Sequence, residues 1–270
     1  MQHSQMKGLN IVDVADLPGQ APKDFVGLVT RAIVDPGYVV IRGLKFGPKD
    51  RATASSFLLD FAQHLGTPIS HDENGSIVWN IRAKEGLSQT VPTFSEHADE
   101  AFLHTDSQYR EAPEDIFALL CLSKATCGGG LSLLMTYDDL MAELAAHPDG
   151  AAHEAALREV SFPFAVPSAF KTNPDGPEEF VYSPILEAGK QIRFRADTIE
   201  VSLRRNDNAL PERGLRAFEA LKAILSTSSK VNSFYLEEGD LFVLNNRNTL
   251  HGRTAFNDAK RHLLRVRLKI

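Results

Sequence analysis

The sequence has few of the features that mark secreted or membrane proteins. It contains only two cysteines, Cys121 and Cys127, which are too few for a disulfide framework and lack a matching pair for a zinc site. No apolar run approaches the roughly 20 residues needed to cross a bilayer. Residues 1–7 lack the apolar centre of a signal peptide. We therefore expect a cytoplasmic protein that makes no use of a membrane.

An excess of basic charge is also missing. Lysine and arginine number 29 against 35 acidic residues, which gives a net charge of −6 and no basic stripe for a phosphate backbone. The 270 residues are 43% hydrophobic and 24% charged, which is ordinary for a globular chain long enough to bury a full core. These values favour a small-molecule partner and argue against nucleic acid.

The first motif that carries chemistry is His104-Thr105-Asp106. Residues 101–106 are typical of a short strand, and residues two apart in a strand point to the same side, so both side chains can reach one ion. Two imidazoles and one carboxylate hold ferrous iron on one triangular face and leave three positions open. A single H-x-D triplet often arises by chance. His251, at the end of a second β-rich segment, supplies the missing imidazole.

A second H-x-D triplet, His97-Ala98-Asp99, competes for the assignment. Its neighbours are polar and turn-like, whereas His104 follows the apolar pair Phe102-Leu103 expected of a strand in a barrel wall. We therefore favour His104 and Asp106 as ligands. His97 is then expected in a loop at the mouth of the site, because binding residues concentrate on loops. Residues 89–101 are loop-like, and we expect a substrate lid there.

Two β-rich segments lie near the C-terminus. Residues 232–246 contain a turn signal at 238–240, which predicts a hairpin whose second strand ends near His251. Residues 261–268 predict a last strand on which Arg261, Leu263, Arg265 and Arg267 share one side. An arginine row on a strand is usually solvated. A guanidinium fork beside a metal ligand, however, suits bidentate capture of a carboxylate.

The order of these motifs resembles a known family. H-x-D is followed by Gly129-Gly130-Leu131-Ser132, then by Leu-Glu-x-Gly-Asp-Leu, His251-Gly-Arg-Thr and Arg261-His-Leu-Leu-Arg265. This set is similar to the iron(II)/2-oxoglutarate dioxygenases of the taurine dioxygenase superfamily. Within this superfamily, the run from Phe234 to Leu268 resembles the clavaminate synthase-like branch, which includes hydroxylases of arginine and asparagine. The similarity covers roughly residues 100–135 and 232–268.

The resemblance implies a role for each matching residue. His104, Asp106 and His251 would be the iron ligands. Arg261 would pair with the distal carboxylate of 2-oxoglutarate, and Ser132 would take the place of a threonine that bonds the same group. Substrate binding is expected of Arg265 and His97, although a structural ion pair is an alternative for Arg265. The implied cofactors and co-substrates are Fe(II), 2-oxoglutarate and dioxygen.

The implied fold is mainly β with flanking helices (α+β), around a double-stranded β-helix or jelly-roll core. One catalytic domain would span residues 1–270, with a helical insertion at roughly 138–228. The implied reaction is hydroxylation of an unactivated carbon of a small metabolite, namely an amino acid or an amino-acid-derived intermediate. Desaturation, epoxidation or cyclisation would use the same cofactors. A zinc or manganese hydrolase or isomerase and a non-catalytic carboxylate-binding barrel are the alternatives from other classes.

Overall fold

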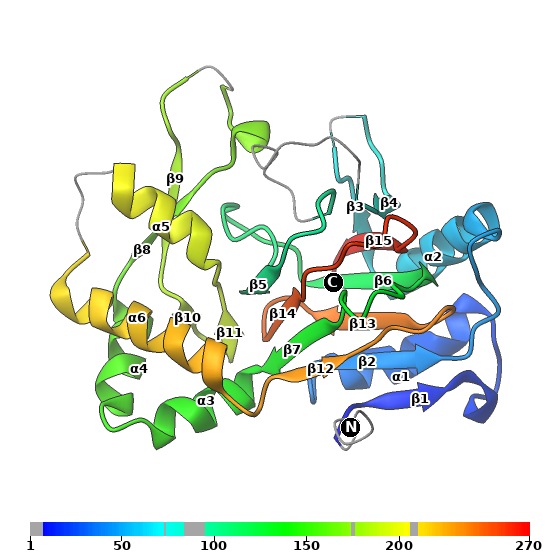
Figure 1. The fold of residues 1–270 in the computed structure, drawn as a ribbon, viewed down its shortest axis with the longest axis horizontal. Helices are drawn as coiled ribbons and strands as arrows, with labels where there is room; N and C mark the ends of the chain where they lie inside the picture. The colour runs from blue at the N-terminus through cyan, green and yellow to red at the C-terminus, as the bar shows by residue number, and fades with distance from the viewer. Residues whose placement is uncertain (1–7, 73, 84–94, 174–175, 206–209) are drawn as a thin grey trace.

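The computed structural model describes residues 8–72, 74–83, 95–173, 176–205 and 210–270. Two sheets form the centre of the molecule (Figure 1). The larger sheet follows the order β1-β2-β13-β6-β15-β3, with β4 also paired to β15. Its strands are β1 (Ile11–Asp13), β2 (Tyr38–Arg42), β3 (Thr67–Ile69), β4 (Trp79–Ile81), β6 (Ile116–Ser123), β13 (Leu241–Asn245) and β15 (His262–Lys269). The smaller sheet, in the order β12-β7-β14-β5, consists of β5 (Ala101–His104), β7 (Ser132–Thr136), β12 (Asn232–Phe234) and β14 (Thr249–Arg253).

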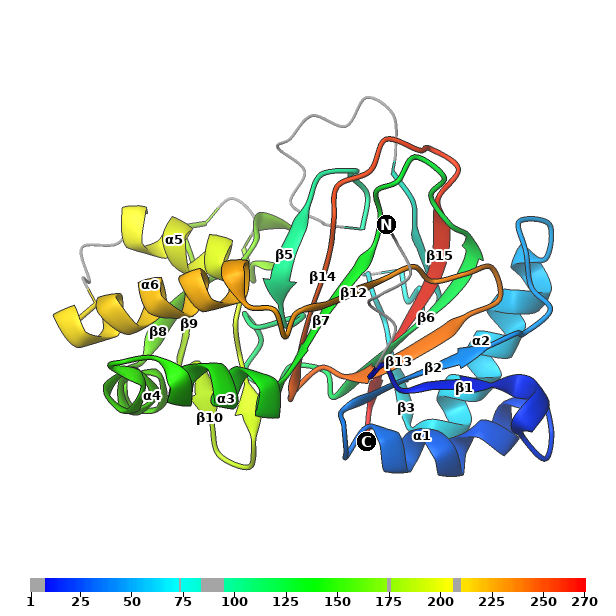
Figure 2. The same cartoon turned by 60° about the horizontal axis from the view of Figure 1, so that its bottom comes forward.

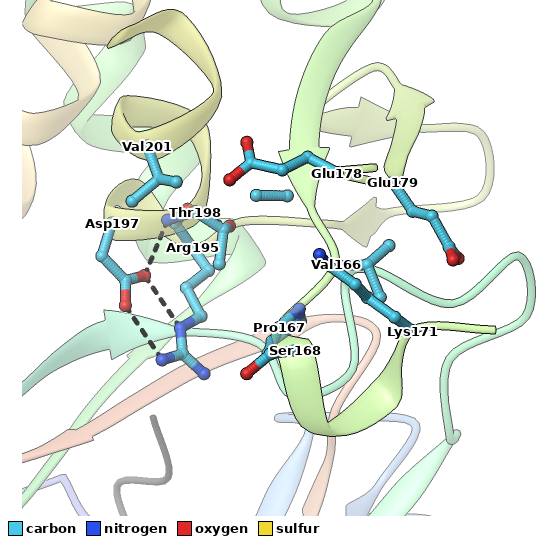
Figure 3. Close-up of a pocket in the computed structure, with 11 residues that line it drawn as sticks. Val166, Pro167, Ser168, Lys171, Glu178, Glu179, Arg195, Asp197, Thr198 and Val201 are labelled. Atoms are coloured by element: carbon cyan, nitrogen blue, oxygen red, sulfur yellow. Dashed lines mark hydrogen bonds and ion pairs between the residues drawn. The ribbon is translucent and has the colours of Figure 1, made fainter. Parts of the chain in front are cut away.

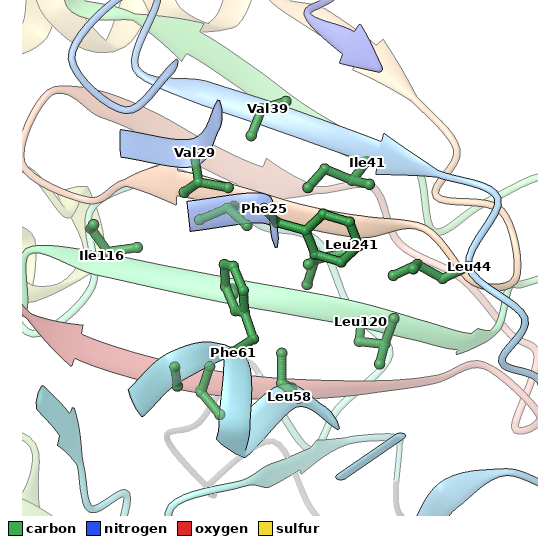
Figure 4. Close-up of a cluster of buried hydrophobic side chains, with 14 of the residues drawn as sticks. Phe25, Val29, Val39, Ile41, Leu44, Leu58, Phe61, Ile116, Leu120 and Leu241 are labelled. Atoms are coloured by element: carbon green, nitrogen blue, oxygen red, sulfur yellow. The ribbon is translucent and has the colours of Figure 1, made fainter. Parts of the chain in front are cut away.

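The outer face of the larger sheet is covered by N-terminal helices, which lie below the sheet in Figure 2. These are η1 (Val14–Asp16), η2 (Pro22–Phe25), α1 (Val26–Ala32) and α2 (Arg51–Leu65). Phe25 and Phe61 are fully buried in this layer, where they pack with Ile116 and Leu241 of the sheet (Figure 4). The opposite face of the sheet packs on the smaller sheet through a second apolar cluster that includes Phe234 and Phe242. Two sheets packed face to face confirm the expected α+β jelly-roll class.

The segment between β7 and β12 forms a separate group of elements, which lies to the left in Figures 1 and 2. The segment where a helical insertion was expected, at roughly 138–228, contains the helices α3, α4, α5 and α6, but it also contains strands. Its elements are α3 (Tyr137–Ala146), α4 (Gly150–Glu159), β8 (Phe162–Ala165), η3 (Ser168–Phe170), β9 (Phe180–Ser183), β10 (Leu186–Glu187), β11 (Gln191–Ile192), α5 (Ala196–Arg205) and α6 (Glu212–Thr227). These elements pack around an apolar core that includes Phe162 and Phe218 and also contains Leu103, Met135 and Leu250 of the smaller sheet.

The hairpin predicted for residues 232–246 is wrong. β12 pairs with β7 in the smaller sheet, whereas β13 pairs with β2 and β6 in the larger one. The turn therefore carries the chain from one sheet to the other. Gly239 has a φ of 84°, and a Cβ there would collide with the backbone oxygen of Leu44. Asp240 is fully buried, accepts from the Glu237 amide and pairs with Arg42 at 2.9 Å, so polar bonds at the turn replace a cross-strand ladder.

Within the described residues, no helix is long and apolar enough to span a membrane. The lid expected at residues 89–101 lies partly outside the described residues. Residues 95–100 are described, and they lead into β5 without forming a helix or strand.

Candidate metal centre and its cavity

His104 is the last residue of β5, and its ring orientation is fixed by the strand. Its Nδ1 lies 2.7 Å from the carbonyl oxygen of Phe102, to which it donates. The neutral ring therefore keeps its lone pair on Nε2, which lies 3.5 Å from Oδ1 of Asp106. Metal-ligating histidines commonly use their second nitrogen in this way, because the hydrogen bond sets both the tautomer and the ring direction.

Asp106 lies beyond the end of the strand, contrary to the prediction that residues 101–106 are all extended. Its position depends on Asn246, which is fully buried between β13 and β14. The Asp106 amide donates to Oδ1 of Asn246 at 2.7 Å, and Nδ2 of Asn246 donates to the Asp106 carbonyl at 3.1 Å. Asn246 belongs to none of the motifs that the sequence offers. Its only signal is an asparagine directly after a buried strand, where an amide side chain can bond the backbone.

His251 is contributed by β14, which pairs with β5 so that His251 lies opposite His104. The two ring centroids are 4.4 Å apart, and the ring edge contacts Phe117 at 4.4 Å between centroids. Nε2 of His251 lies 4.0 Å from Oδ1 of Asp106. One donor atom from each of the three side chains fits within 4.8 Å of the other two. The structure thus brings together the three predicted ligands.

The electrostatics of the cluster favour the protonation states that a metal requires. Burial lowers the pKa of His251 well below its usual value, and the neighbouring His104 lowers it further. Burial alone would raise the pKa of Asp106, but Arg265 and the two imidazoles lower it well below the usual carboxyl range. A neutral imidazole and an ionised carboxylate are the forms that coordinate a divalent cation.

A cavity of about 80 Å³ opens onto these three residues and reaches Ser132, Arg253 and Arg261. Arg261 is only 5% exposed, and its Nη1 has no hydrogen-bond partner among the residues that the structure describes. Its guanidinium lies over the ring of Phe256, 5.1 Å from the centroid. Burial lowers the pKa of Arg261 to about 10. A buried cation with an unused donor, facing a cavity, is suited to an anionic ligand.

Ser132 and Gly130 border the same part of the cavity. Ser132 begins β7 and is buried there, next to β14. Gly130 has a φ of 77°, and a Cβ at this position would lie 3.2 Å from Cδ of Arg261. The glycine thus leaves room for the arginine stem. The Gly-Gly-x-Ser motif therefore places a hydroxyl and a guanidinium in one cavity.

Arg265 lies close to the metal cluster. Its Nη1 donates to Oδ2 of Asp106 at 3.1 Å, and its Nε lies 3.2 Å from Nε2 of His71. His71 in turn stacks on Trp79, with centroids 5.8 Å apart. No short spacing in the sequence marks His71, because its contact with Arg265 joins residues almost 200 positions apart. Arg265 also lines the cavity, so its predicted role in substrate binding stays a prediction.

His97 does not join the metal cluster. Its carbonyl oxygen accepts from Nη2 of Arg253 at 3.0 Å, and the Asp99 carbonyl accepts from the same nitrogen. Arg253 thus fixes the backbone of the loop before β5, and its guanidinium lies 4.8 Å from the Phe256 centroid.

Arg267 lies on the same strand as Arg265, but it pairs with Glu114 at 3.3 Å and not with Asp106. Within the described residues, His104 and Asp106 form a ligand group with His251, whereas the triplet that begins at His97 does not.

The chain belongs to the taurine catabolism dioxygenase TauD/TfdA family, whose profile matches residues 7–267. It is 28% identical over 170 residues to a glutarate 2-hydroxylase of Citrobacter koseri, covering 61% of this chain and 47% of the relative. The chain thus spans about half the length of this curated relative.

Two solved structures share the fold. An asparagine oxygenase in complex with Fe(II), 3-hydroxyasparagine and succinate superposes with a TM-score of 0.71 at 22% identity, over 92% of this chain and 78% of that one. The non-haem iron oxygenase OrfP, in complex with Fe and α-ketoglutaric acid, superposes with a TM-score of 0.70 at 17% identity and the same coverage.

Proposed function

We propose that this protein is an Fe(II)/2-oxoglutarate-dependent oxygenase that hydroxylates an unactivated carbon of a small metabolite, an amino acid or a compound derived from one. The observation that carries the proposal is the coincidence of two features in one cavity. A group of three donors suited to ferrous iron lies beside a buried arginine with an unused donor.

His104, Asp106 and His251 would hold the metal on one face and leave the opposite positions open. The guanidinium of Arg261 and the hydroxyl of Ser132 would hold the distal carboxylate of 2-oxoglutarate. When bound, iron and 2-oxoglutarate supply the oxidising power that activates dioxygen toward a C–H bond. The protein orients the substrate and excludes water from the cavity, whose polar and charged residues are mostly buried.

The alternatives each leave one feature unexplained. A zinc or manganese hydrolase or isomerase would not require the buried Arg261 beside the metal. A non-catalytic barrel that binds a carboxylate would not require two imidazoles and a carboxylate within 4.8 Å. Desaturation, epoxidation and cyclisation remain outcomes of the same site, because they differ only in how the substrate is placed.

Arg265 and His97 are proposed to contact the substrate. Arg265 lies against Asp106, where it borders the space next to the metal. His97 is partly exposed in the loop before β5. In this arrangement the substrate carboxylate faces Arg265, and the acidic residues of the loop face its amine. The relatives named above include enzymes whose names specify glutarate and asparagine, which supports a small substrate that carries a carboxylate.

The test is formation of succinate from 2-oxoglutarate by the purified protein. We expect slow formation with Fe(II) and dioxygen, faster formation when an amino acid of the correct type is added, and none with Zn(II). Dependence on Fe(II) separates the proposal from a hydrolase, and succinate formation separates it from a binding protein. A protein that binds Fe(II) and 2-oxoglutarate but forms no succinate with any amino acid or derivative would contradict the proposal.

A further inference from the structure

The arginines of the molecule differ in how their charge is compensated. A second and larger cavity, of about 240 Å³, lies between the β8–β9 region and the start of α5 (Figure 3). Its arginine, Arg195, is compensated there, because its Nε and Nη2 donate to the two carboxylate oxygens of Asp197 at 2.8 and 2.9 Å. At the metal cluster, Arg261 forms no ion pair with any residue that the structure describes. The proposed function gives Arg261 and Arg265 a carboxylate each, but it gives no role to Arg253, which lines the same cavity.

Arg253 borders the part of the cavity in which the distal carboxylate is proposed to bind. It ends β14, two residues after His251, and its side chain is buried. It pairs in register with Ser132 of β7, so the two side chains are cross-strand neighbours on one face of the smaller sheet. Ser132, Arg253 and Arg261 therefore enclose one subsite.

The guanidinium groups of Arg253 and Arg261 share one aromatic ring. They lie 4.8 and 5.1 Å from the ring centroid of Phe256. A ring face attracts a nearby cation, so Phe256 stabilises both groups without neutralising either. Both groups are charged at neutral pH, and the two like charges repel each other in this buried place. An anion bound between them would remove that repulsion.

Arg253 and Phe256 also hold the loop before β5. Nη2 of Arg253 donates to the carbonyl oxygen of His97 at 3.0 Å and to that of Asp99. The Phe256 amide donates to the carbonyl oxygen between them, that of Ala98, at 2.9 Å. Two residues beside the anion subsite thus bind three consecutive carbonyl groups of the loop. The position of the loop depends on where these two residues lie.

We propose, on the basis of the proposed function, that Arg253 is a positioning residue that links the anion subsite to residues 97–99. With a carboxylate bound by Arg261 and Ser132, Arg253 faces a compensated charge in place of an uncompensated one. Its guanidinium is then stabilised where it holds the two carbonyl groups. Coupling between two sites is reciprocal. The loop is therefore more ordered when the subsite is filled, and the subsite binds its anion more tightly when the loop is in place.

The experiment measures hydrogen–deuterium exchange in residues 95–104 and at the Phe256 amide, which reports directly on the bond to Ala98. The whole protein is loaded with Mn(II), which prevents turnover. 2-Oxoglutarate should slow exchange at both places about fivefold or more, the lower end of the coupling typical between two sites. 2-Oxopentanoate has the same carbon chain without the distal carboxylate, and it should leave exchange unchanged. Equal slowing by both acids would overturn the link through the subsite.

Two variants at position 253 separate charge from packing. Arg253→Met keeps an apolar stem and removes the cation and both carbonyl bonds, so 2-oxoglutarate should no longer slow exchange in residues 95–104. Arg253→Lys keeps the charge but lacks the planar fork that reaches both carbonyl groups, so it should keep part of the effect. A residue that only fills space would give the same result in both variants. The matched control is Arg213→Met, which removes an arginine whose side chain is 58% exposed and should exchange as the wild type does.

Binding of 2-oxoglutarate is measured by calorimetry on the same samples. A wild-type protein that binds none contradicts the proposed function itself. A wild-type protein that binds it with no change in exchange at the loop contradicts only the role of Arg253. Full slowing in a folded Arg253→Met protein has the same meaning. If Arg253→Met does not give a cooperative unfolding curve, the test rests on Arg253→Lys, where slowing equal to that of the wild type contradicts the link.

Discussion

The two cavities each contain an arginine, but the arginines differ in what surrounds them. In the cavity at the metal cluster, Arg261 is buried and its Nη1 has no hydrogen-bond partner within the described part of the chain. In the larger cavity, Arg195 is paired with Asp197 through two nitrogens. The first environment favours an added anion, whereas the second is already neutral. On the proposed function, the site between the two sheets would carry the oxidative chemistry, because the three candidate metal ligands and Arg261 border one cavity there.

The largest effect that tests this comparison is loss of the metal. His251→Ala or His104→Ala should abolish Fe(II) binding and all succinate formation, with or without substrate, because two remaining ligands hold iron weakly. Metal binding is measured by titration under anaerobic conditions, and folding by thermal unfolding. His97→Ala is the matched control, since this residue lies outside the cluster. Unchanged iron affinity in the His251 variant would refute the assignment.

The next effect concerns 2-oxoglutarate. Removing a bidentate arginine partner from a carboxylate typically costs about 2–5 kcal/mol. Arg261→Ala should therefore raise the 2-oxoglutarate concentration required for half-maximal turnover by about two orders of magnitude at constant iron affinity. Arg261→Lys should restore part of the loss, because a point charge cannot reproduce the fork. If the requirement does not change, Arg253, which lines the same cavity, performs this role.

A third prediction separates binding of the substrate from the slow formation of succinate that occurs without substrate. Arg265→Ala should abolish stimulation of succinate formation by the substrate and spare the slow reaction without it. The contact with Asp106 makes iron affinity the necessary control, because loss of Arg265 removes the main charge that lowers the pKa of this carboxyl group. If both rates fall together with iron affinity, Arg265 acts by holding Asp106 and not by binding the substrate.

The sequence predicted the fold class, most of the helices and the residues that meet at the cluster, because these depend on ordered motifs and local periodicity. It did not predict features that depend on contacts between distant segments. The turn at Gly239 has the composition of a hairpin, yet burial of Asp240 against Arg42 directs the two strands into different sheets. Asn246 was missed because no short spacing marks it. Its role follows from its bonds to Asp106, which meets it only in the folded chain.

The smallest expected effect is that of His97→Ala on the substrate. The backbone of this loop is held by Arg253 through the carbonyl of His97, and that bond survives removal of the imidazole. The change therefore removes one side-chain contact, and a single hydrogen bond contributes about 0.5–1.5 kcal/mol. We expect the KM for the substrate to rise by up to about tenfold, while the 2-oxoglutarate requirement and the succinate rate without substrate stay constant. Arg253→Ala should have a larger effect on the same KM, because it releases the loop backbone as well. Equal KM values for wild type and His97→Ala would place His97 outside the substrate site and leave its loop with a purely structural role.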